Sequence, residues 1–160
     1  MDAPSAIESP DYGTVLVDID IFGVSRHSNH SVVYRQNNPG LGLTLGVIAG
    51  EQLDWVTSFG SYRDSYDNHA RYAMTGLRYV FGDRHEVHWG ATVVIGYLDG
   101  SGVRGPGIIP VAQIGYDRVS MCLTGSYERS SGSDPHTQKN PYLIKTAVIA
   151  VFADIEVLRW

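Results

Sequence analysis

Apolar and polar residues alternate with a period of two along most of the chain, in segments rich in Val, Ile, Tyr and Thr that are separated by Gly, Asp, Asn and Pro. This period is typical of β-strands with two different faces, and the helical period of 3.6 is nearly absent. The pattern predicts eight strands, at about 14–25, 40–49, 53–62, 69–81, 85–98, 107–116, 118–128 and 142–155.

The two faces of these strands differ in polarity. In the first strand one face is aliphatic, and the other carries the carboxylates Asp18 and Asp20. In the fifth, Trp89 and Val93 share a face that alternates with small and polar residues such as Thr92. We therefore predict an all-β fold, an eight-stranded antiparallel outer-membrane β-barrel with an apolar outside and a mixed polar inside. The alternative is a soluble, lipocalin-like barrel, which keeps its apolar face inside.

The connections alternate in length, which gives the barrel a direction. Tight turns are predicted near Ala49–Gln52, Gly82–Arg84 and Asp117–Arg118, and longer loops at 26–39, 63–68, 99–106 and 129–141. Outer-membrane barrels place short turns in the periplasm and long loops outside. Both termini are then periplasmic, and we expect the protein in the outer membrane of a Gram-negative bacterium.

Composition narrows the class of protein further. The length predicts a single domain over 1–160, with 1–12 as a short periplasmic N-terminal segment. A formal net charge of −5 argues against a nucleic-acid partner. Cys122 is the only cysteine, so an intramolecular disulfide and a Cys-based zinc site are excluded. His85 and His88 fall on opposite faces of a strand, so we expect no metal site, and we expect a monomer.

Three polar residues are placed at the outer rim by this topology. His27 lies where the first predicted strand meets the first long loop, and Asp64 and Ser65 form the tip of the second. An imidazole base, a hydroxyl group and a carboxylate that orients the imidazole are the groups that acyl transfer needs. Ordinary solvated loop residues are the alternative interpretation.

The stretch GVSRHSNHSVVYRQNNPGLGLTLG, followed by SFGSYRDSYDN, resembles the lipid A palmitoyltransferase (PagP) family, and IIPVAQIGYDRVSM resembles that family's Pro-containing strand, tight turn and following strand. The resemblance implies a cofactor-free acyltransferase that moves a palmitoyl chain from a phospholipid donor to the acceptor lipid A. His27 would be the general base, Ser65 the nucleophile or an oxyanion donor, and Asp64 the orienting carboxylate. Residues 1–12 contain two prolines and are too short for the family's N-terminal amphipathic helix, so the chain would be a divergent member.

The same resemblance implies an acyl-chain pocket inside the barrel, with Gly76 as the floor that measures the chain and Arg63 and Tyr66 at the substrate. On this hypothesis Gly76→Met shortens the preferred acyl chain. Alternatively, Gly76 relieves strand curvature. Arg71 and Arg78 are expected to be solvent-exposed or to meet lipid phosphates.

Two other functions stay open at this point. A lipid A deacylase on a similar barrel would release a fatty acid to water, and a non-enzymatic barrel would have a structural or lipid-binding role only.

Overall fold

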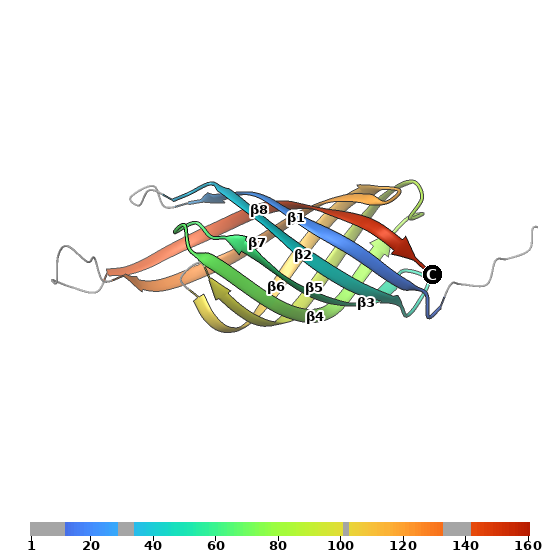
Figure 1. Ribbon diagram of the computed structural model, residues 1–160, viewed down its shortest axis with the longest axis horizontal. Helices are drawn as coiled ribbons and strands as arrows, with labels where there is room; N and C mark the ends of the chain where they lie inside the picture. Colours follow the sequence, from blue (N-terminus) through green and yellow to red (C-terminus); the bar gives the residue numbers. More distant parts are fainter. Residues whose placement is uncertain (1–11, 29–33, 101–102, 133–141) are drawn as a thin grey trace, which may run out of the picture.

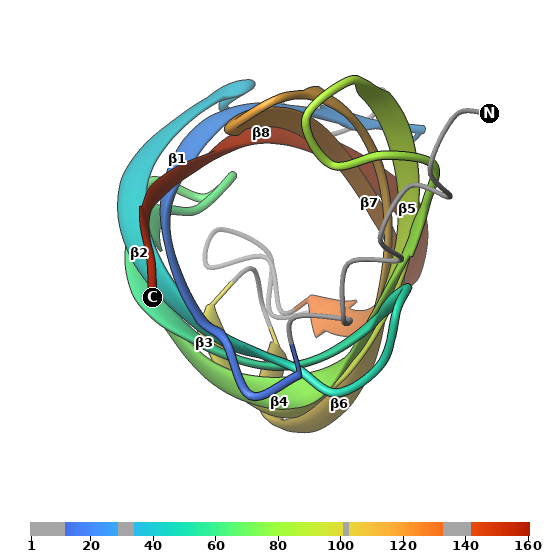
Figure 2. The same cartoon turned by 90° about the vertical axis from the view of Figure 1, so that its right-hand side faces the viewer.

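The computed structural model describes residues 12–28, 34–100, 103–132 and 142–160 of the chain. They form one closed antiparallel barrel in sequence order, with β1 paired to β8 (Figures 1 and 2). The strands are β1 (Val15–His27), β2 (Asn37–Ile48), β3 (Leu53–Arg63), β4 (His69–Phe81), β5 (Val87–Gly100), β6 (Val103–Tyr116), β7 (Val119–Gly132) and β8 (Tyr142–Arg159). The predicted eight-stranded barrel is confirmed, whereas the segment predicted over 1–12 lies outside the described residues except for Tyr12. No helix in the described ranges is long and apolar enough to cross a membrane.

The outer surface of the barrel is apolar and the interior is polar. Large exposed side chains on the outward faces include Trp55, Phe59, Leu77, Phe81, Trp89, Val93, Ile95, Ile108, Ile114, Met121, Leu123 and Ile149. Buried polar side chains on the inward faces include Asp18, Asp20, Thr44, Asp54, Arg78, His88, Thr92 and Gln113. This distribution is that of a transmembrane barrel and is the inverse of a soluble one.

The two ends of the barrel differ as predicted. At one end, which we call the turn end, short connections 49–52, 82–86 and 117–118 join the strands. At the other, the loop end, β1 and β2 are joined by 28–36, β3 and β4 by 64–68, and the β7–β8 hairpin projects furthest (Figure 1).

The loop predicted at 99–106 is wrong, because the β5–β6 ladder includes residues 99–100 and 103–106. Its last pairs are Leu98 with Gly105, Asp99 with Arg104 and Gly100 with Val103. Gly and Pro normally interrupt a strand. At this level, in the described part of the chain, β6 is not paired with β7 and so has a free edge. Pro106 has no N–H donor, and it is tolerated because a free edge does not need one.

Strands β6 and β7 are paired over only part of their length. Their ladder runs from Tyr116–Val119 to Val111–Thr124, and in the described part of the chain the segments 103–110 and 125–132 are not paired with each other. The Thr124 hydroxyl donates to the carbonyl oxygen of Pro110 at 2.8 Å, where the ladder ends. The barrel wall therefore parts between β6 and β7 in its loop-end half.

A β-bulge at Gly23 changes the facing of the last part of β1. The register shifts between Phe22 and Val24 against both neighbouring strands. Below the bulge even-numbered residues such as Asp18 point inward, whereas above it Ser25 and His27 are the buried ones. A bulge inserts one unpaired residue and so inverts the alternation beyond it. His27, predicted at the start of a loop, is thus the last residue of β1 and faces the interior.

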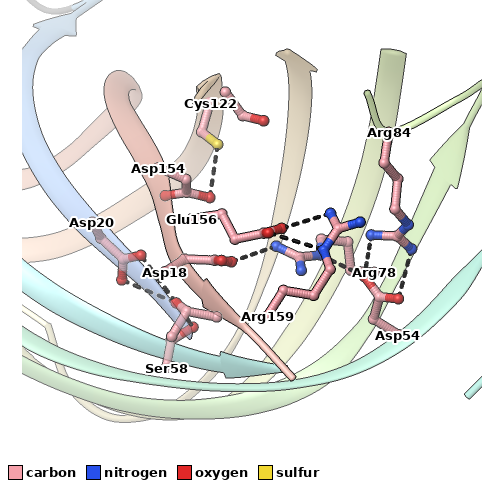
Figure 3. Close-up of polar contacts among 12 residues, drawn as sticks. Asp18, Asp20, Asp54, Ser58, Arg78, Arg84, Cys122, Asp154, Glu156 and Arg159 are labelled. Carbon is pink, nitrogen blue, oxygen red and sulfur yellow. Dashed lines mark hydrogen bonds and ion pairs between the residues drawn. The ribbon is translucent and has the colours of Figure 1, made fainter. Parts of the chain in front are cut away.

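Buried ion pairs fill the interior near the turn end (Figure 3). Arg78 donates from Nη1 to Asp18 Oδ2 at 2.7 Å and from Nε to Asp54 Oδ2 at 2.8 Å. Arg84 bonds both oxygens of Asp54, at 2.6 and 3.0 Å. The expectation of an exposed or lipid-facing Arg78 is wrong, because this strand position faces inward where Asp18 and Asp54 neutralise it.

Replacing Arg78 by Met is expected to lower the free energy of unfolding by about 3–5 kcal/mol, because it leaves Asp18 buried without a cation. Arg71→Met is the matched control, since Arg71 lies on the same strand but is exposed on the outward face; a surface change of this kind costs within about 0.5 kcal/mol. Urea unfolding in lipid vesicles, followed by tryptophan fluorescence, measures both. Equal losses in the two variants would contradict the assigned role of the ion pairs.

Candidate functional site

The loop-end half of the interior contains a cavity of about 460 Å³. One wall is aliphatic, built from the inward residues Val56, Met74, Val94, Leu98 and Ile109. Another part of the wall is aromatic: Phe22 stacks on Tyr62 and Phe152, with ring centroids 5.1 and 5.3 Å apart, and meets Tyr72 edge-on. Its size and apolar walls suit a small hydrophobic ligand.

The floor of the cavity is polar and reaches the ion pairs, since Arg78 lines the cavity together with Asp20 and Asp154. Asp20 accepts hydrogen bonds from the Tyr72 hydroxyl at 2.9 Å and from the Thr44 hydroxyl at 3.0 Å. Asp154, beside Asp20 on β8, accepts one from the Cys122 thiol at 3.2 Å. Cys122 is fully buried, as expected for a small packed side chain.

Two glycines make room for Tyr72 to cross the floor. A Cβ on Gly42 would lie 2.1 Å from the Tyr72 hydroxyl, and one on Gly60 would lie 2.8 Å from its ring. Tyr72 therefore extends over β3 and β2 to reach Asp20 on β1. The cavity is closed by this cross-barrel contact and not by a single residue at its base.

The mouth of the cavity carries three buried polar side chains from three parts of the chain. Ser25 donates to Asn38 Oδ1 at 2.6 Å, and its oxygen lies 3.2 Å from the Ser65 oxygen. Asn38 Nδ2 donates to the carbonyl oxygen of Arg63 at 3.0 Å. All three line the cavity. Ser65, which the sequence grouped with His27 at the rim, thus contacts Ser25 of β1.

His27 lies at the same rim but is not bonded to the other predicted site residues. Its side chain is 5% exposed and stacks on Tyr34, with centroids 4.0 Å apart and planes within 7°. Among the described residues neither Nδ1 nor Nε2 has a hydrogen-bond partner. A buried imidazole without partners is costly unless a ligand or water completes it.

Asp64 shapes the turn that carries Ser65. Its Oδ1 accepts the backbone N–H groups of Tyr66 at 2.9 Å and Asn68 at 2.8 Å, and the side chain is 1% exposed. Asp67, inside this turn, has a positive φ of 65°. The observed bonds of Asp64 thus hold the loop in shape, which places Ser65 at the mouth.

The two residues predicted to contact substrate flank this turn. Arg63 donates to the carbonyl oxygen of Asp67 at 2.9 Å and is half-exposed. Tyr66 meets Tyr34 edge-on, with centroids 5.6 Å apart. Both lie at the rim, beside the mouth and outside the cavity walls.

Gly76 has a different environment from the one that a chain-length floor requires. A Cβ there would lie 1.9 Å from the Val93 carbonyl oxygen and 2.7 Å from the Val94 Cα, both backbone atoms of β5. It does not line the cavity. The close approach of two curved strands explains the glycine, in agreement with the alternative that it accommodates curvature.

No group of three or more His, Cys, Asp or Glu in the described ranges is arranged to hold a metal ion. His88 faces inward near Ser120, and His85 is exposed beside Asp117 at 3.5 Å. His85 lies in the turn before β5 and not on the strand as predicted, so the strand period does not determine its direction.

Ser25, Asn38 and Tyr72 are the site residues that sequence reasoning missed. Strict alternation from Asp18 and Asp20 turns Ser25 outward, and only the bulge at Gly23 brings it inside. Asn38 was assigned to a loop, yet β2 begins at Asn37. The run of glycines at 40 and 42 was a usable signal, since glycines on an inward face indicate a bulky neighbour that crosses them.

Comparison with known proteins leaves the family open. No protein-family model and no curated protein matches the chain. Similar solved structures include the crystal structure of Ail, the attachment invasion locus protein of Yersinia pestis, with 12% identity, a TM-score of 0.48, and coverage of 93% of this chain and 99% of that one. The backbone structure of Ail in a phospholipid bilayer nanodisc has 11% identity, a TM-score of 0.46 and coverage of 90% and 99%. These values are too low to transfer a function, and the palmitoyltransferase resemblance stays a prediction.

Gly76→Ala is expected to lower the free energy of unfolding by roughly 1–3 kcal/mol, because its methyl group collides with the β5 backbone. Gly107→Ala is the control: Gly107 lines the cavity, and a Cβ there meets no atom within 4 Å. Denaturant unfolding in vesicles compares them. A destabilised Gly107 variant beside an unaffected Gly76 variant would contradict the geometry.

Proposed function

We propose that this protein is an outer-membrane barrel that takes the acyl chain of a membrane lipid into its loop-end cavity. The observation that carries this proposal is a cavity with largely apolar walls inside a barrel that also buries charged side chains. Supporting it, Gly107 and Ile109 of β6 and Gly125 of β7 line the cavity at the level where these strands part. A chain in the outer leaflet has a side entrance there.

The affinity for such a lipid has to come chiefly from the mouth. An acyl chain in a bilayer is already surrounded by hydrocarbon, so moving it into an apolar cavity gains little hydrophobic free energy. Polar groups of the lipid, however, would meet Ser25, Asn38 and Ser65 at the mouth. The head group and ester are then held at the rim, and the cavity selects the chain.

Val94→Trp is expected to weaken or abolish retention of a long-chain lipid, because Val94 is 7% exposed and points into the cavity. Val93→Trp, one residue away, adds the same bulk on the outward face, where Val93 is 53% exposed, and should retain lipid as the native protein does. Native mass spectrometry of barrels released from detergent gives the bound mass. Lipid binding that is equal in both variants would place the chain elsewhere.

Acyl transfer is the second candidate, favoured by one further observation. His27 is buried at the rim that carries Ser65, and both its ring nitrogens are unpartnered among the described residues. An imidazole in this state can accept the proton of an attacking hydroxyl group and return it to the leaving alkoxide. We infer transfer of a palmitoyl chain from a phospholipid to lipid A, with an ester formed as another breaks.

The native protein, refolded in detergent with phospholipid and lipid A, is expected to add one palmitoyl group to lipid A, as read by mass spectrometry. His27→Ala should slow transfer by roughly 10²–10⁴-fold through loss of the base. His85→Ala is the control, since His85 is exposed at the turn end. Release of free fatty acid without acylated lipid A would instead indicate a deacylase, and lipid binding without either product a non-enzymatic lipid-binding barrel.

A further inference from the structure

The hydrogen bonds at the cavity mouth run in one direction, and the direction can be deduced from a single backbone group. The carbonyl oxygen of Arg63 can only accept, so the atom of Asn38 that faces it is the amide nitrogen. The Asn38 oxygen consequently faces Ser25, and an amide oxygen also only accepts.

The hydroxyl of Ser25 has one proton, which this contact uses. Ser25 donates it to Asn38 Oδ1 at 2.6 Å. In the 3.2 Å contact between the oxygens of Ser25 and Ser65, Ser65 must then be the donor. The order is Ser65 to Ser25 to Asn38 to the Arg63 carbonyl. Ser25, Asn38 and Ser65 are each less than 8% exposed.

We propose that Ser25 and Asn38 are positioning residues which hold the Ser65 hydroxyl with its proton turned away from the cavity and its lone pairs turned toward it. In this state Ser65 presents an acceptor oxygen to the polar part of a bound lipid, such as a hydroxyl or ammonium group. It does not present a proton to an ester carbonyl. The consequence of this inference for catalysis rests on the proposed acyl transfer.

Three parts of the chain must cooperate for this arrangement. The Gly23 bulge turns Ser25 inward, the early start of β2 brings Asn38 to the mouth, and the Asp64 turn delivers Ser65. Backbone hydrogen bonds also hold Ser25 and Ser65 in place. The Arg35 N–H donates to the Ser65 carbonyl oxygen at 2.9 Å, and the Ser25 N–H donates to the Gln36 carbonyl oxygen at 2.8 Å. The side chains are therefore held by a rigid frame.

The test compares Ser25→Ala with Ser25→Thr in the full chain, refolded in detergent and supplied with phospholipid and lipid A. Removing the hydroxyl should lower kcat/KM by roughly 10- to 100-fold through misplacement of Ser65. Threonine keeps the hydroxyl and should restore most of the rate. A merely structural role for Ser25 predicts instead that both variants behave alike, and that any loss follows the loss of thermal stability. Unchanged kcat/KM in Ser25→Ala, with active native protein, overturns the proposal.

A second measurement is independent of activity. The Ser65 hydroxyl proton should give an NMR signal protected from exchange with water in the native protein, and Ser25→Ala should abolish that protection. If the native protein proves inactive, acyl transfer is wrong, and the protected proton still establishes the hydrogen-bond order. An unprotected Ser65 proton in the native protein overturns the order itself, whatever the activity.

Discussion

In a closed barrel each strand residue faces either the interior or the outer surface. One extra residue at Gly23 determines which residues face the interior at the loop end of β1. Without that residue the side chains of Ser25 and His27 would face hydrocarbon, where an unpaired polar group costs several kcal/mol. With it, both face the interior while Asp18 and Asp20 below still do so. A single bulge thus lets one strand contribute to the ion pairs and to the cavity mouth.

The charged and apolar parts of the interior depend on each other. Arg78 and its carboxylates tie β1, β3 and β4 together from the inside, beside the buried aliphatic side chains of Leu16 and Val80. Tyr72 then spans the barrel above them, where Gly42 and Gly60 leave room for its ring. The loop-end half therefore contributes less to the packing of the barrel than a hydrophobic core would, and it can contain an apolar cavity.

The sequence predicted the architecture well because a strand period of two is a local property. Strand number, facing of β5, and the three short turns are all read from neighbours in the chain. It failed where a distant partner decides. Arg78 is buried where Asp18 and Asp54 face it, and 99–100 and 103–106 extend β5 and β6, with Asp99 paired to Arg104. The contact of Ser25 with Ser65 joins residues 40 positions apart and depends on a bulge that alternation cannot show.

His27 and Ser65 lie at the same loop-end rim, but His27 contacts Tyr34 and Ser65 contacts Ser25. This difference affects how the proposed acyl transfer would proceed. The Ser65 proton is engaged by Ser25, so it is not offered to His27, whose buried ring nitrogens have no hydrogen-bond partner among the described residues. A base that is unoccupied before substrate arrives is suited to deprotonate the substrate's own hydroxyl. For the proposed acyl transfer, this arrangement favours direct attack of the acceptor lipid on the donor ester, with Ser65 as an orienting group, over an acyl-enzyme on Ser65.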